Sequence, residues 1–209
     1  MPRHPDPELE ERILKAADAL WRRGGEKALT MRAVARAAGT NTPAVYRRFK
    51  DRQDLVRGIL LRVAARVREY FERATKLEDM ADGYVQFALD HPNEFQLFYT
   101  EARLLTLPRK RGAPVAPIRE SRPNFAFAER MAAKEMGGSP EEYAEFTLAL
   151  WSIVHGAATL LLNGGVPPGH EQALRDACRA GIRALIEQTK LSRENYGRGA
   201  ISGDVAGRQ

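Results

Sequence analysis

The stretch AGTNTPAVYRRFKDRQDL, residues 38–55, places a glycine, a helix-starting Thr42-Pro43 pair and a dense run of cationic side chains close together. Gly39 can end a preceding helix, because glycine tolerates the left-handed backbone of a helix C-terminus. Pro43 sits at or beside the first position of the next helix, where its missing N–H costs nothing. This helix is only about two turns long. Two helices joined by a glycine turn, the second short and polar outside, are typical of a helix-turn-helix that places its second helix in the DNA major groove.

The surrounding sequence supplies the other helices of such a motif. An amphipathic pattern predicts a helix over residues 8–23, closed by Gly24 and Gly25. Thr30 can cap the first helix of the motif. Asp51 looks like the cap of a fourth helix that runs to about residue 75.

Basic residues are concentrated in the same region. The chain has a net charge of +6, and residues 27–57 hold eight basic and two acidic side chains, an excess equal to that of the whole protein. Such a patch attracts polyanions by counterion release, so nucleic acid is the first partner to consider. A solvated basic face without a partner is the alternative.

Composition and length place the chain among soluble globular proteins. Of its 209 residues, 44% are hydrophobic and 29% are charged. Cys178 is the single cysteine, which excludes an internal disulfide framework. We expect no signal peptide, no membrane span and a cytoplasmic location. The most apolar run, LALWSIVHGAATLLLNGG, is interrupted by His155 and Gly156, and we interpret it as a buried helix.

The remaining sequence predicts helices only. Two of these helices are separated by a break at His91-Pro92. The run from Ser139 to Glu142 is a strong signal for the start of another helix. A final amphipathic helix covers residues 170–189. Residues 192–209 have little to bury, so we expect a disordered tail. The chain is predicted to be all-α, with about nine helices and no strand.

The stretch LTMRAVARAAGTNTPAVYRRFKDRQDLV also resembles the DNA-binding signature of the TetR family of bacterial regulators, over roughly residues 9–60. This resemblance implies a helix-turn-helix domain over residues 1–52 and a ligand-binding and dimerisation domain over residues 53–191. It also implies a homodimer formed through the last two helices, and a repressor of a palindromic operator that releases DNA on binding an inducer. One departure is Arg52, where the family more often carries lysine.

The resemblance implies DNA contacts of two kinds. Residues expected at base edges are Thr42, Pro43, Ala44 and Arg47. Residues expected at or near phosphates are Thr30, Tyr46, Arg48 and Arg52. The chemistry agrees, because Arg47 can bind guanine with two hydrogen bonds, while the alanine methyl and the proline ring can touch a thymine methyl. Solvated charges at Arg48 and Arg52, and a packing role for Tyr46, are the alternatives.

A second resemblance concerns the C-terminal half. The run LALWSIVHGAA, together with HPNEFQLFY, is similar to the WHG type of TetR C-terminal domain. The candidate ligand-binding residues are Phe87, Phe95, Phe98, Tyr99, Trp151 and His155. Ordinary core packing is the alternative for all of them. An apolar, partly aromatic cavity would suit a small hydrophobic inducer.

Other functional classes receive less support. The four histidines show no metal-ligand spacing, and neither a nucleophile motif nor a phosphate-binding glycine loop is present, so we expect no catalysis, metal or cofactor. A nonspecific DNA-coating protein would use the same basic patch without reading sequence, and a regulator that has lost its ligand is a further possibility.

Overall fold

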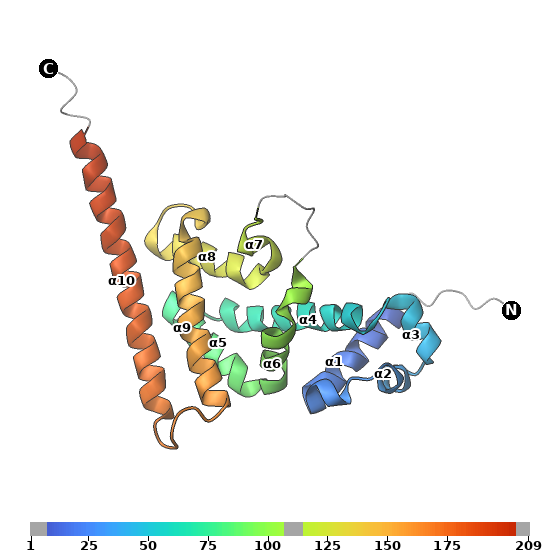
Figure 1. The fold of residues 1–209 in the computed structure, drawn as a ribbon. Helices are drawn as coiled ribbons and strands as arrows, with labels where there is room; N and C mark the ends of the chain where they lie inside the picture. Colours follow the sequence, from blue (N-terminus) through green and yellow to red (C-terminus); the bar gives the residue numbers. More distant parts are fainter. Residues whose placement is uncertain (1–7, 107–114, 204–209) are drawn as a thin grey trace. The chain divides into compact units, whose positions relative to one another are not determined.

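The computed structural model describes residues 8–106 and 115–203, with the backbone alone for residues 196–203. Within these ranges the chain forms ten α-helices and two 3-10 helices and has no strand, which confirms the all-α prediction (Figure 1). Packing divides the chain into two units. The first comprises the chain up to Glu69 together with Phe87–Asn124, and the second comprises Tyr70–Gln86 and the chain from Phe125 onward.

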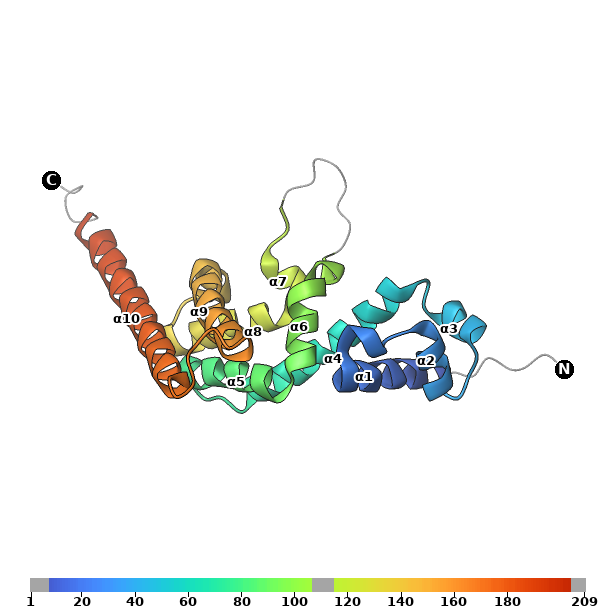
Figure 2. The same ribbon diagram turned by 60° about the horizontal axis from the view of Figure 1, so that its bottom comes forward.

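Four helices begin the first unit. They are α1 (Leu9–Ala28), α2 (Met31–Ala37), α3 (Thr42–Arg48) and α4 (Arg52–Glu72). Figure 2 shows the first three grouped beside the start of α4. Their shared core consists of aliphatic side chains with no exposed surface: Ile13, Val34, Val45, Leu55 and Ile59. Burial of these side chains, each worth roughly 1.5–3 kcal/mol, holds the short helices together.

The turn between α2 and α3 has the predicted glycine. Gly39 has φ of 65° and stands just past the end of α2. The Gly39 N–H donates to the Arg36 carbonyl at 3.2 Å, and the Thr40 N–H donates to the Ala35 carbonyl at 2.9 Å. These two bonds form a Schellman motif, which satisfies the last carbonyls of α2 and turns the chain toward α3.

The end of α1 differs from the prediction. Gly25 has φ of 57° and ψ of −146°, a conformation essentially restricted to glycine, and it interrupts the helix as expected. One more helical turn then follows and ends at Ala28. That turn brings the Glu26 carboxylate within 3.1 Å of the Arg52 guanidinium at the start of α4.

The first unit also contains α6 (Pro92–Glu101), the 3-10 helix Ala102–Leu105 and α7 (Ile118–Ser121). The first turn of α6 is joined to α1 by two hydrogen bonds. The Trp21 indole N–H donates to the Asn93 carbonyl at 2.8 Å, and the Asn93 amide donates to the Arg22 carbonyl at 2.9 Å.

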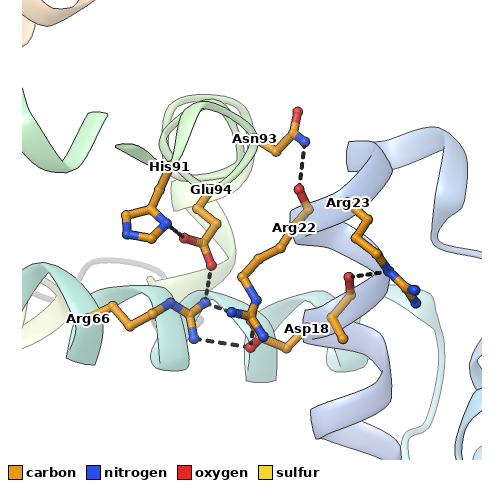
Figure 3. A network of polar contacts seen from close by, with 8 residues as sticks. Asp18, Arg22, Arg23, Arg66, His91, Asn93 and Glu94 are labelled. Atoms are coloured by element: carbon orange, nitrogen blue, oxygen red, sulfur yellow. Dashed lines mark hydrogen bonds and ion pairs between the residues drawn. The ribbon is translucent and has the colours of Figure 1, made fainter. Parts of the chain in front are cut away.

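Buried ionic groups make a further connection among α1, α4 and α6 (Figure 3). The Arg66 guanidinium donates to both carboxylate oxygens of Asp18, at 2.6 and 3.1 Å, and forms an ion pair with Glu94. His91 Nδ1 lies 3.0 Å from Oε2 of Glu94. Asp18 and Glu94 are only 4% and 1% exposed, so one guanidinium serves two buried carboxylates.

The second unit is built from most of α5 (Leu77–Asp90) and α8 (Pro123–Met136), with α9 (Ala144–Leu162) and α10 (Glu171–Gly203). The predicted break at His91-Pro92 and the predicted start at Ser139 are confirmed. The Ser139 N–H donates to the Glu142 carboxylate at 2.9 Å, and the first turn, Pro140–Tyr143, is a 3-10 helix.

The last helix is longer than predicted. It continues to Gly203, past residue 189, where we expected it to end, and through part of the tail expected to be disordered; residues 204–209 lie outside the described residues. Extending a formed helix costs far less than starting one. Arginines of α10 pair in register with polar residues of α5: Arg183 with Glu78 at 3.7 Å, Arg179 with Asp82 at 2.9 Å, and Arg175 with Gln86 at 3.4 Å.

Among the described residues, one helical stretch, Pro140–Leu162, is long and apolar enough to cross a membrane. One third of its most apolar window is buried inside the protein. The core helix of a soluble protein has the same length and hydropathy.

Candidate nucleic-acid interface and aromatic cluster

The predicted recognition helix α3 is short and capped. The Asn41 side chain accepts the Ala44 N–H at 2.9 Å, and proline occupies the first turn, as predicted. Val45 packs inward, while Pro43, Tyr46 and Arg47 are exposed. Because these three positions are spaced i, i+3 and i+4, they form one face of the helix.

Burial counts against one predicted base contact. Ala44 is only 3% exposed, so its methyl group belongs to the core of the helix-turn-helix and is not available to a thymine. The buried side of α3 includes Ala44 beside Val45, and it continues to Phe49 one turn later. The inward stripe of a helix covers more than 100°, which is wider than our prediction allowed.

The other predicted contacts lie on or near this surface. Thr30 is exposed and caps α2 by accepting the Ala33 N–H at 3.1 Å. Thr42 and Arg48 are partly exposed. The Arg52 guanidinium donates to the Glu26 carboxylate at 3.1 Å, which the sequence did not indicate.

The exposed side of α3 has the chemistry of a base-reading surface. Arg47 can present two parallel N–H donors to guanine, and Pro43 an apolar ring to a thymine methyl. The exposed cations Arg32, Arg36 and Lys50 stand on neighbouring segments, where they can contact phosphates without reading sequence. The region therefore combines a capped helix that has a polar exposed face with exposed cations on the segments around it.

A second candidate site lies entirely in the second unit. Aromatic rings from α4, α5, α8 and α9 form a connected cluster. The centroid distances are 6.3 Å for Phe71–Tyr84, 6.0 Å for Phe71–Phe127, 6.5 Å for Phe125–Trp151, and 6.3 Å for both Tyr84–His155 and Trp151–His155. Tyr84, Phe127, Trp151 and His155 remain partly exposed.

A chain of hydrogen bonds runs through this aromatic cluster. The Trp151 indole N–H donates to the Tyr84 hydroxyl at 3.2 Å, and that hydroxyl lies 2.9 Å from Nδ1 of His155. Burial lowers the pKa of His155, which favours the neutral imidazole, and burial raises the pKa of Tyr84 to about 12. Neutral His155 can accept a hydrogen bond from the Tyr84 hydroxyl at Nδ1 in the tautomer that carries its own proton on Nε2. The cluster is thus uncharged and largely apolar, and its polar groups are those of Trp151, Tyr84 and His155.

The six predicted ligand residues do not form one group within either unit. Trp151 and His155 are four residues apart on α9 and belong to the aromatic cluster. Phe87, Phe95, Phe98 and Tyr99 belong to the first unit. Phe87 and Phe95 are 1% and 6% exposed, which favours the core alternative, whereas Tyr99 is 69% exposed and is not enclosed.

Sequence reasoning missed the other rings of the cluster, namely Phe71, Tyr84, Phe125 and Phe127. Helical periodicity indicates an inward face for each of them but not which helices meet. The Tyr84–His155 and Tyr84–Trp151 bonds join residues 71 and 67 positions apart. Only tertiary packing brings such residues together.

An all-helical chain in which a capped helix-turn-helix presents a polar, basic second helix is a DNA-binding protein of the transcription-regulator class. Residues 13–59 match the model of the bacterial regulatory proteins of the tetR family, and residues 77–185, more than half of the chain, match the tetracyclin repressor-like C-terminal domain. The chain belongs to the TetR family of transcriptional regulators.

Solved structures share this fold. A protein of unknown function from Rhodococcus sp. RHA1 has 22% identity and a TM-score of 0.61, covering 90% of this chain and 97% of its own. A TetR variant from Acinetobacter baumannii AYE, in complex with minocycline, has 18% identity and a TM-score of 0.59, covering 91% and 99%. The multidrug binding protein EbrR, complexed with imidazole, has 21% identity and a TM-score of 0.56, covering 88% and 93%. Among curated proteins, none matches the sequence significantly.

Proposed function

We propose that this protein is a cytoplasmic, ligand-responsive repressor that binds a palindromic operator as a homodimer and has no enzymatic activity. The exposed face of α3 carries the proposal, because Pro43, Tyr46 and Arg47 project from a helix that its cap and buried side hold rigid. Two such helices, related by two-fold symmetry, would read half-sites about 10 base pairs apart.

Selection of DNA from a random pool tests this function directly. The winning duplex and a scrambled duplex are compared at one fixed salt concentration. We expect a palindrome bound about a thousandfold or more tightly than the scrambled site. Uniform weak binding would instead favour a nonspecific DNA-coating protein.

Arg47→Ala should weaken operator binding by about 1–3 kcal/mol and relax base preference at one position of each half-site. The physical reason is the loss of two directed hydrogen bonds to a base edge. Affinity for a set of single-base operator variants measures the effect. An unchanged base preference would remove Arg47 from direct readout.

For the dimer interface we propose the outer faces of α9 and α10, which pack against each other (Figure 1). On α9 the exposed stripe has a spacing of four residues: Leu148, Ser152, Gly156 and Leu160. On α10 an exposed stripe of small residues is formed by Ala173, Ala177, Ala180 and Ala184. Leu148 and Leu160 are 38% and 43% exposed, and a second copy of the chain would cover them.

Gly156 supports this choice of interface. A methyl group at this position would meet no other side chain or distant backbone of the same chain within 4 Å. Packing within one protomer therefore does not require glycine in the middle of α9, where glycine costs about 1 kcal/mol relative to alanine. Close approach of a second helix would require it.

For the inducer we propose the aromatic cluster, with an uncharged, largely apolar aromatic molecule as the ligand class. Rings that remain partly exposed can stack on such a molecule, and the Trp151–Tyr84–His155 chain can orient a polar group. In this proposal helix α4 transmits the effect of the ligand, because it begins at Arg52 and carries Phe71 near its other end. A ligand that favours one arrangement of α4 would change DNA affinity by negative coupling.

Quenching of tryptophan fluorescence tests the ligand site. Trp151 should report binding of planar aromatic compounds, and Tyr84→Phe should weaken that binding by roughly 1 kcal/mol, because the hydroxyl between Trp151 and His155 is lost. Tyr99→Phe removes an exposed hydroxyl outside the cluster and should have no effect. Equal losses for the two variants would exclude the aromatic cluster as the binding site.

A further inference from the structure

Two aspartate carboxylates of the chain itself cap the start of α4. The Asp51 carboxylate accepts the Asp54 N–H at 2.9 Å, and the Asp54 carboxylate in turn accepts the Lys50 N–H at 3.1 Å. The first bond is the N-cap half of a capping box, and the second ties Asp54 to the residue before the N-cap. The N–H groups of Lys50 and Asp54 therefore already donate to aspartates, and a DNA phosphate at this position can be bound by the side chains of Lys50 and Arg52.

One of these two side chains is already engaged. Nη2 of Arg52 lies 3.1 Å from Oε1 of Glu26, while the arginine and glutamate side chains are 38% and 74% exposed. Glu26 reaches this position because α1 makes one more turn after Gly25. Both members of the pair are accessible, so a phosphate can approach the guanidinium from solvent.

We infer that Glu26 is a built-in competitor for the phosphate that Arg52 binds, and that it lowers affinity for all DNA sequences alike. The inference rests on the proposed DNA-binding function. A carboxylate and a phosphate use the same N–H donors of a guanidinium. Arg52 must release Glu26 before it can bind a phosphate with those donors. The free energy lost when this exposed ion pair breaks therefore weakens DNA binding.

The competition has two measurable consequences. Exposed ion pairs contribute little to stability, so release of Glu26 should change affinity only severalfold. Glu26 also neutralises part of the local positive charge, so fewer counterions leave the DNA than Arg52 alone would displace. Sequence preference should not change, because phosphate contacts carry no base information.

The test is Glu26→Gln in the full-length protein, with a random-sequence DNA duplex as the probe. We expect affinity to increase about two- to fivefold. The plot of log affinity against log salt concentration should become steeper by about one unit. Glu120→Gln makes the same change in net charge at an exposed position on α7 and should alter neither quantity.

Repeating the test in a protein that lacks Arg52 separates the effect of the ion pair from general charge repulsion between Glu26 and DNA. In an Arg52→Gln protein, Glu26→Gln should produce a smaller gain in affinity than in the wild type. An equal gain in both backgrounds, or no gain in either, would overturn the inference. If wild-type protein binds neither the random duplex nor any selected duplex, the proposed function fails instead.

Discussion

Leu160→Glu is expected to convert the protein to a monomer and to lower operator affinity by about 10²- to 10⁴-fold, the gain that linking two binding modules can provide. Leu160 is 43% exposed on the proposed interface of α9, so a carboxylate there is solvated in the monomer. In the dimer the same carboxylate would be buried without a partner, at a cost of several kcal/mol. Light scattering measures the dimer, and titration of the selected operator measures the affinity.

Two further variants sharpen this test. Gly156→Leu should also disrupt the dimer, because its first side-chain atom is free of contacts within the protomer but would obstruct a neighbouring helix. Leu61→Glu places the same charge at an exposed leucine of α4, 52% exposed, and should remain dimeric. If the Leu160 and Gly156 variants are both dimeric, the interface lies elsewhere.

Arg66→Met is expected to destabilise the protein by about 3–5 kcal/mol, the usual cost of removing one partner of a buried ionic group. Methionine fills much of the same volume but removes the cation between Asp18 and Glu94, 4% and 1% exposed, and leaves Asp18 only the longer contact with Arg22, at 3.7 Å. The connection of α1 and α6 through α4 is lost at the same time (Figure 3). Urea unfolding followed by circular dichroism measures the change in free energy.

Arg62→Met is the matched control for that measurement. It lies one turn earlier on α4 and pairs with Glu11 at 2.5 Å, but Glu11 is 52% exposed. Water can solvate the remaining carboxylate, so the loss should be far smaller than for Arg66→Met. Similar losses for Arg62→Met and Arg66→Met would mean that the buried network contributes nothing beyond an ordinary surface pair.

Local signals predicted the helices well. Gly39 ended α2, proline began α3, and Ser139 with Glu142 began the segment leading into α9, all as expected. Such signals act over three to five residues, through caps and turns whose partners are close in sequence. For the same reason they were sufficient to locate the helix-turn-helix.

Local signals were not sufficient where the outcome depended on more distant contacts. Ala44 was assigned to the DNA surface, but packing within the helix-turn-helix buries it. The boundary between a DNA-binding and a ligand-binding domain at residue 52 stays a prediction. Packing groups α6 with the first three helices in one unit. Neither the hydrogen bond between Trp21 and Asn93, which are 72 positions apart, nor the pairing of Glu26 with Arg52 has a sequence signal.

The sequence by itself determined that this protein is all-α, that it carries a helix-turn-helix with a basic second helix, and that it resembles the TetR family. Tertiary structure alone decided which aromatic rings meet, which arginine lies between two buried carboxylates, and which glutamate reaches Arg52. Helix formation is governed by contacts within a few residues, which a sequence displays. The sites depend on side chains from helices far apart in the chain, and only packing of the core sets their distances.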